Sequence, residues 1–141
     1  MTAAQHMATA PAESKGAIVW TGRILSGLVV LFLLFDGAIK LVPLQVVTDT
    51  VIPLGWPTDA TTWRALGIVL IASALLYAYP RTSVLGAILI TAYLGGAVAT
   101  QMRVGSPLFS HTLFGVYLGI ILWGGLWLRD PRVRALLPMA R

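Results

Sequence analysis

The chain has 141 residues, of which 57% are hydrophobic and 11% are charged, and its mean hydropathy is +0.84. A soluble globular domain carries about 25% charged residues, so this composition excludes an ordinary soluble domain and predicts an integral membrane protein. The absence of cysteine excludes disulfides and thiolate sites within the chain, and the net charge of +5 is expected to follow from membrane topology and not from nucleic-acid binding.

The first 40 residues divide into a polar part and an apolar part. Residues 1–16 are small and polar without an apolar pattern, which predicts a flexible tail. The stretch 17–40 is apolar apart from Arg23, Asp36 and Lys40, and at about 1.5 Å per residue it can cross a hydrocarbon core of about 30 Å. We predict a first transmembrane helix over 17–40 and not a cleaved signal peptide, because the apolar run is too long for one.

Three prolines interrupt the next stretch, 41–60, which predicts a long external connection. They are Pro43, Pro53 and Pro57. The pattern allows a short helix at the membrane interface that starts at Pro43 and ends by Ile52.

The second and third spans are expected over 61–79 and 83–102. Either Thr58 or Asp59 can cap the start of the second span, since both side chains accept hydrogen bonds from backbone N–H groups. Pro80 ends that span, because the residue before a proline disfavours the helical conformation.

A fourth span is expected over 107–128, with Ser106 as N-cap and Pro107 at the first helical position. The chain should therefore fold as an all-α, antiparallel four-helix bundle in the membrane. Its single domain would cover residues 17–129, and residues 130–141 would form a basic C-terminal tail.

The distribution of basic residues predicts the orientation, because cytoplasmic segments of membrane proteins are rich in lysine and arginine. With four spans, both termini share one side with the turn after the second span. That side holds seven basic residues and the opposite side three, so both termini are expected in the cytoplasm. The seven are Lys15, Arg23, Arg81, Arg129, Arg132, Arg134 and Arg141, and the three are Lys40, Arg64 and Arg103.

Small residues recur at every fourth position in the third and fourth spans, a pattern that lets helix backbones approach closely in a membrane. They are Ala87, Thr91, Gly95 and Ala99 in one and Gly115 and Gly119 in the other. The pattern predicts that these two spans are neighbours, and it leaves open whether one small-residue face forms a homo-oligomer.

The predicted topology brings polar residues from all four spans to the extracytoplasmic side. The candidate ligand-binding residues are Asp36, Lys40, Arg64, Gln101, Arg103 and His111. Asp36 lies roughly one helical turn inside the apolar region. An ionisable residue at that depth usually faces a partner or a wet cavity, which makes Asp36 a functional candidate.

Each candidate also has a structural interpretation. Asp36 and Lys40 share a helix face and can pair, and Arg103 is an alternative partner for the acid. His111 could bind a carbonyl such as a quinone head, or it could simply bond to Asp36 or to a loop carbonyl.

The other three polar candidates could bind an anionic or carbonyl-bearing ligand. The guanidinium groups of Arg64 and Arg103 could instead extend to lipid headgroups. Gln101 offers an amide at the same end of the bundle. His111 is the only histidine in the region expected to fold, so neither a bis-histidine haem nor a multi-histidine metal site is expected within one chain.

Several segments, in order and spacing, resemble the DoxX-like family of small bacterial membrane proteins. They are Gly37-Ala38-Ile39-Lys40-Leu41, Leu54-Gly55-Trp56-Pro57, Ser110-His111-Thr112-Leu113-Phe114 and Trp123-Gly124-Gly125-Leu126-Trp127-Leu128-Arg129-Asp130. The resemblance implies a four-helix bundle in the bacterial cytoplasmic (inner) membrane. The family takes its name from a subunit associated with quinone-linked thiosulfate oxidation, so a redox role is implied as well.

Three functions are compatible with these residues. The first is a binding or accessory subunit for a lipophilic carbonyl ligand, for example a quinone, in membrane redox metabolism. The second is a non-enzymatic scaffold or assembly protein, and the third is a small transporter or isomerase-type enzyme, which the lack of predicted broken helices disfavours. Expected partners are membrane lipids and either a second copy of the chain or a respiratory or redox subunit.

Overall fold

The computed structural model describes residues 3–42 and 45–139, and in these ranges every regular element is a helix. The elements are α1 (Ala3–Leu41), α2 (Gln45–Val51), α3 (Ala60–Ala78), α4 (Ser83–Arg103), the π-helical η1 (Leu108–Thr112), α5 (Phe114–Arg129) and α6 (Pro131–Leu136). Four stretches are long and apolar enough to cross a membrane: Lys15–Leu41, Ala60–Ala78, Ser83–Arg103 and Leu108–Arg129. The fold is thus an all-helical bundle compatible with a membrane.

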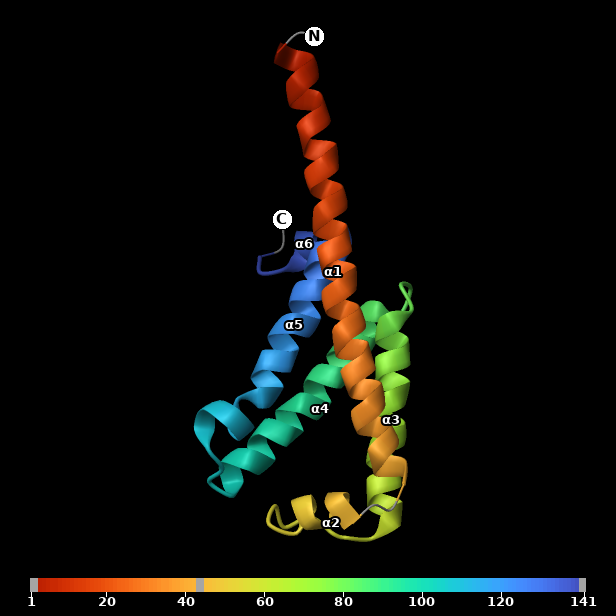
Figure 1. Cartoon of the computed structure of the whole chain (residues 1–141), viewed down its shortest axis with the longest axis vertical. Helices are drawn as coiled ribbons and strands as arrows, with labels where there is room; N and C mark the ends of the chain where they lie inside the picture. Colours follow the sequence, from red (N-terminus) through yellow and green to blue (C-terminus); the bar gives the residue numbers. More distant parts are fainter. Residues whose placement is uncertain (1–2, 43–44, 140–141) are drawn as a thin grey trace.

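Helix α1 begins at Ala3 and not at residue 17, and its N-terminal part extends past the other helices (Figure 1). Residues 3–16 were expected to form a tail, but they are rich in alanine and other good helix formers. Adding residues to an existing helix avoids the cost of nucleation, so the transmembrane part of α1 can propagate into this stretch. The flexibility of residues 1–16 stays a prediction.

The start of α3 follows the sequence prediction, and Asp59 is the N-cap. Its Oδ2 accepts a hydrogen bond from the backbone N–H of Thr62 at 2.9 Å, and the Thr62 hydroxyl donates to the same carboxylate. These hydrogen bonds, the backbone one foremost, lower the pKa of Asp59 below its ordinary value of 3.8. At the other end, Tyr79 leaves the helical conformation before Pro80.

The cap gives a prediction about pH. Because the folded-state pKa of Asp59 is lowered, its stabilising effect is present above pH 3.8 and is lost as the pH falls through the folded pKa. Thermal unfolding in detergent between about pH 3 and pH 5 should therefore show an acid-induced loss of stability that is smaller in Asp59→Asn, since asparagine caps without titrating. An equal loss in the asparagine variant would contradict the assignment, and Asp59→Ala should be less stable at pH 7.

The fourth span differs from the continuous helix expected over 107–128. Its first turn is π-helical: the N–H of Thr112 donates to Pro107 O at 3.1 Å, and that of Leu113 donates to Leu108 O at 2.9 Å. Ser106 does not act as an N-cap, because its hydroxyl donates to Oε1 of Gln101 at 2.5 Å. The regular helix α5 begins only at Phe114.

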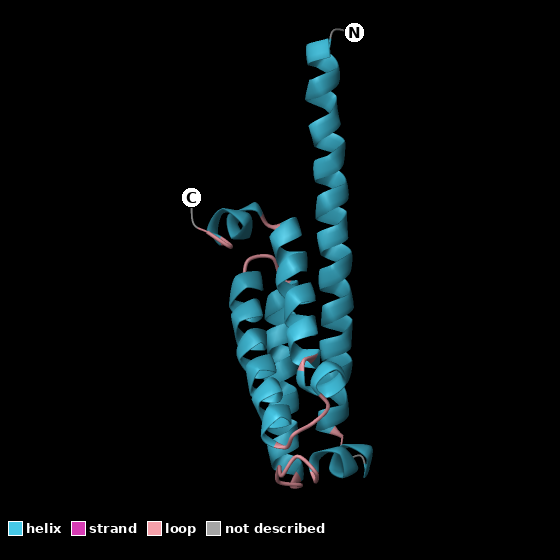
Figure 2. Cartoon of the chain, turned by 90° about the vertical axis from the view of Figure 1, so that its left-hand side faces the viewer, coloured by secondary structure: helices cyan, strands magenta, loops and turns pink. Residues whose placement is uncertain are grey.

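Each spanning helix packs against two others: α1 and α4 both contact α3 and α5, so α1 and α4 lie diagonally across the bundle (Figure 2). The buried core includes Leu33, Leu70, Ile90, Leu122 and Leu126. The expected contact between the third and fourth spans is confirmed, since α4 packs on η1 and α5.

The two glycines expected at this contact behave differently. A Cβ added to Gly115 would lie 2.9 Å from Cγ2 of Val98, so Gly115 is part of the α4 contact. Around Gly119, by contrast, there is open space within 4 Å. Only the first glycine of the pair therefore serves close packing inside the chain.

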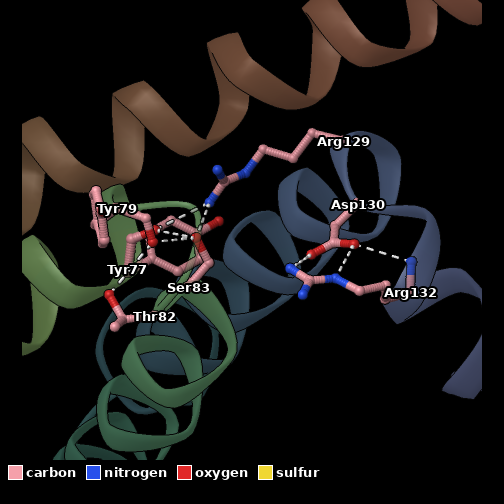
Figure 3. Close-up of polar contacts among 7 residues, drawn as sticks. All are labelled: Tyr77, Tyr79, Thr82, Ser83, Arg129, Asp130 and Arg132. Atoms are coloured by element: carbon pink, nitrogen blue, oxygen red, sulfur yellow. Dashed lines mark hydrogen bonds and ion pairs between the residues drawn. The ribbon is translucent and has the colours of Figure 1, made fainter.

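A polar cluster joins α5 to the turn between α3 and α4 (Figure 3). The Nη2 of Arg129 donates to Tyr77 O at 3.1 Å and to Ser83 Oγ at 3.3 Å, and the guanidinium lies 5.0 Å from the centre of the Tyr77 ring. The Tyr77 hydroxyl donates to Leu122 O at 2.6 Å, inside the core. Arg129 was expected to serve topology and lipid contact, and it also holds three helices together.

The residues after α5 form a short helix where the sequence predicted only a basic tail. Pro131 occupies the first turn of α6, and Asp130 caps it by accepting a hydrogen bond from the backbone N–H of Arg132 at 2.9 Å. The Arg132 side chain pairs with Asp130 at 3.1 Å (Figure 3). This helix packs against α5.

Candidate ligand cavity

A cavity of about 320 Å³ lies at the end of the bundle that carries α2 and η1. Its walls come from α1, α3, α4 and α5, and residues of α2 and of the following loop also line it. The cavity is thus built by segments far apart in the sequence, at the end of the bundle where the sequence predicted a polar cluster.

The cavity has an apolar part and a polar part. Phe32, Leu33, Leu94, Phe114 and Leu118 line the apolar part. The polar lining residues include Asp36, Lys40, Thr50, Tyr93, Gln101 and His111. A space of this kind suits a molecule with an apolar body and a small polar head.

Four of the six predicted site residues line this cavity, namely Asp36, Lys40, Gln101 and His111. The two arginines do not line it. The convergence expected from topology is therefore present for the residues of α1, α4 and η1.

Arg64 and Arg103 bond to backbone carbonyls at this end of the bundle, Arg64 to that of Leu41, the last residue of α1, and Arg103 to that of Leu54 in the loop after α2. The Nη2 of Arg103 donates to Leu54 O at 2.5 Å, and the Nε of Arg64 donates to Leu41 O at 3.3 Å. The indole N–H of Trp63 adds a third such bond, to Pro57 O at 2.6 Å. These side chains hold the connection that carries α2 over the end of the bundle.

Asp36 and Lys40 form the ion pair that their spacing predicted, with Nζ and Oδ2 2.5 Å apart. The Lys40 side chain is 14% exposed and the Asp36 side chain 30% exposed. The pair therefore places two charges in the cavity wall, and most of the carboxylate's interaction is with its own neighbour on α1.

Gln101 reaches the cavity from the last turns of α4. Its Oε1 accepts the hydrogen bond from Ser106, which orients the amide so that the NH₂ group is the free part. The tight turn after α4 makes this contact, and Gly105 adopts a positive φ of 69° in it.

His111 lies in the π-helical segment, and this changes its surroundings. The sequence placed it on one inward face with Gly115 and Gly119, but the π turn shifts the register, and the residue is exposed while it still lines the cavity. Its Nδ1 lies 2.7 Å from the hydroxyl of Ser110, where the sequence suggested Asp36 or a loop carbonyl as partner.

Sequence reasoning placed Trp63 at this end of the bundle, but it missed four other aromatic residues of the lining, Phe32, Trp56, Tyr93 and Phe114. Tyr93 could have been found, because it lies two helical turns before Gln101 and residues at i, i+4 and i+8 share a helix face. Trp56 could not, because its position depends on the irregular connection after α2. It packs against Trp63 in the first turn of α3. Their rings pack edge to face, with centroids 6.0 Å apart.

A family model described as the DoxX-like family matches residues 24–125, a range that holds every residue lining the cavity. The chain belongs to the DoxX-like family. No curated protein and no solved structure matches it. With its four apolar helices, this DoxX-like protein is a multi-pass membrane protein.

Proposed function

We propose that this DoxX-like protein binds a lipophilic molecule with a carbonyl head, such as a quinone, in the cavity between α1, α4 and α5. The observation that carries the proposal is the division of the cavity into an apolar part and a polar part that offers hydrogen-bond donors. A quinone has the matching form, since its ring and tail are apolar and its oxygens are acceptors.

Donors remain for a ligand because neighbouring acceptors are engaged within the chain, and because the Lys40 ammonium has N–H bonds beyond the one that it donates to the Asp36 carboxylate. The Asp36 carboxylate is paired with Lys40, and Oε1 of Gln101 accepts from Ser106. The cavity then presents the Gln101 NH₂ group, the Lys40 ammonium and the Nε2 edge of His111. A ligand that carries acceptors and no net charge fits this set best.

The same proposal includes the setting of the protein. We infer an antiparallel bundle in the bacterial inner membrane with both termini in the cytoplasm. The short turn between α3 and α4 and the excess of basic residues on the side of the termini support it. In this orientation the cavity lies at the extracytoplasmic end of the bundle, where an accessory subunit could exchange a quinone with a redox partner.

Tryptophan fluorescence tests the proposal, because Trp56 and Trp63 line the cavity and quinones quench indole emission. A background with the other three tryptophans changed to phenylalanine reports on the cavity alone. Titration with decylubiquinone should give saturable quenching. His111→Ala and Gln101→Ala should each weaken binding by about tenfold, the effect of losing a hydrogen bond of about 1.4 kcal/mol.

Gln45→Ala is the matched control, because Gln45 bonds to Asp49 on α2 and does not line the cavity. It should bind decylubiquinone like the parent protein. Linear, non-saturating quenching in the parent, or equal affinity in all variants, would contradict the proposal.

A second candidate function, a scaffold that binds partner helices or a second copy of the chain, has one observation in its favour. Gly95, Gly96 and Gly119 have open space around them and so leave room for the backbone of another helix. Failure of quinone binding in the parent protein would favour this function.

A further inference from the structure

Two phenylalanines form an edge of the cavity between α1 and α5. The ring centroids of Phe32 and Phe114 are 5.6 Å apart with an interplanar angle of 58°. Both rings line the cavity, and Phe32 is 40% exposed and Phe114 is 45% exposed. The pair therefore closes the seam between α1 and α5 beside the cavity, and we call it the wall between these helices.

The backbones of α1 and α5 are close only at the opposite end of their contact. A Cβ added to Gly22 would lie 2.7 Å from Gly125 O, and one added to Gly125 would lie 2.7 Å from Ser26 Oγ. From this crossing the two helices diverge toward η1, as Figure 1 shows. Near the cavity, the side chains of Phe32 and Phe114 bridge the wider separation.

The depth of this wall fits a membrane-dissolved ligand. Phe32 lies nine residues before Leu41, the end of the first span, which corresponds to about 13 Å at about 1.5 Å per residue. Asp36 and Lys40 lie nearer that end. A ligand would thus keep its polar head toward the membrane surface and its apolar part deeper, the orientation that an amphiphile already has in a lipid leaflet.

Entry into the cavity from the aqueous side is more obstructed than entry between α1 and α5. Helix α2 and the loop after it line the cavity, and Arg103 and Trp63 hold this connection by hydrogen bonds to Leu54 O and Pro57 O. Val51 at the end of α2 is 4% exposed. By contrast, the wall between α1 and α5 includes two phenylalanine side chains, which can change rotamer without a change in the backbone.

We propose that the ligand enters the cavity sideways from the bilayer, between Phe32 and Phe114, and is therefore an amphiphile dissolved in the membrane and not a water-soluble metabolite. This rests on the proposed function, since it assumes that the cavity binds a ligand. It adds the physical class of that ligand and assigns Phe32 and Phe114 as the residues that control its passage.

The absence of cysteine from the chain allows a direct test with single thiols. Val98→Cys places a thiol in the cavity wall, and Leu31→Cys places one on the outside of α1, where Leu31 is 67% exposed and does not line the cavity. In lipid vesicles both are treated with dodecyl methanethiosulfonate, which dissolves in the bilayer, or with its water-soluble sulfonatoethyl analogue. The thiolate forms a disulfide with the reagent and methanesulfinate leaves.

The cavity thiol should react with the dodecyl reagent and resist the sulfonatoethyl one. Phe32→Ala or Phe114→Ala should speed the dodecyl reaction about tenfold, as a barrier lower by about 1.4 kcal/mol does, and Phe32→Trp should slow it. Phe35→Ala and Phe109→Ala are matched controls, because these phenylalanines are 66% and 73% exposed and do not line the cavity. Each labelling rate of Val98→Cys is divided by the rate of Leu31→Cys in the same background, which corrects for any change in reagent concentration or folding.

Two results would overturn the proposal: equal acceleration by the control substitutions, or faster labelling of Val98→Cys by the sulfonatoethyl reagent, which would place the route on the water side. Neither reagent carries a carbonyl group, so the outcome does not depend on quinone recognition. Normal decylubiquinone quenching with a failed labelling test would reject the lateral route alone, and the reverse pattern would reject the quinone alone.

Discussion

Gly86→Ala is expected to separate α4 from α3 and to destabilise the bundle by about 3 kcal/mol, at the upper end of the cost of inserting a methyl group into a packed interior. An added Cβ would lie 2.2 Å from Tyr77 N, 2.6 Å from Tyr77 Cα and 2.8 Å from Leu76 C. All three are backbone atoms at the end of α3, so no side-chain rotation relieves the clash. The turn that joins the two helices must move instead.

Gly95 gives the matched control on the same helix. A Cβ added there meets nothing within 4 Å, and alanine is a better helix former than glycine by roughly 0.5–1 kcal/mol. Gly95→Ala should therefore unfold like the parent protein or at a slightly higher denaturant concentration. Unfolding in mixed micelles, followed by circular dichroism, measures both variants, and similar stability of the two would show that the contact at Gly86 adapts at little cost.

The two glycines also show which part of the fold was predictable. Apolar stretches bounded by prolines were enough to locate the spans, because their length must match the membrane. The small-residue repeat correctly predicted that the third and fourth spans touch, but it included Gly95, which faces open space, and omitted Gly86, which has the tightest contact. The spacing of small residues identifies a face of a helix, but it does not say which other helix packs against that face.

The site was predictable to a similar degree. Helix spacing predicted the Asp36–Lys40 pair, and topology placed Gln101 and His111 near it. Arg64 and Arg103 were beyond such reasoning. Arg103 bonds to a carbonyl of an irregular connection whose path no periodicity describes, and the bond of Arg64 to the last carbonyl of α1 depends on where that connection brings the start of α3. The π turn at His111 forms because backbone N–H groups there bond to the carbonyl five residues earlier and not four. Packing decides between these two hydrogen-bond patterns, and the sequence pattern does not show it.

Lys40→Met is expected to have the largest effect on ligand binding, and it also distinguishes a binding role for the ion pair from a structural one. Removing the ammonium leaves the Asp36 carboxylate in the cavity wall without its partner. Breaking a buried pair in this way costs about 3–5 kcal/mol, and partial exposure reduces the expected loss of stability here to about 1–3 kcal/mol. Decylubiquinone affinity should fall by at least about tenfold, because the carboxylate repels the carbonyl oxygens.

The pair of Asp130 and Arg132 provides the control, since its cation is 73% exposed, whereas the Lys40 side chain is 14% exposed. Arg132→Met removes a cation from an ion pair at the start of α6, at the opposite end of the bundle. Its effect on stability should stay below about 1 kcal/mol, as for other surface pairs, and decylubiquinone binding should not change.

The double variant Asp36→Leu, Lys40→Met completes the test. Replacing both charges by apolar side chains of similar volume removes the unpaired carboxylate, so the free energy of unfolding should return to within about 1 kcal/mol of the parent value. Quinone affinity should stay low, because the ammonium donor is still missing. If binding recovered together with stability, the pair would serve only to shape the wall, and recognition of the ligand head would then rest on Gln101 and His111 alone.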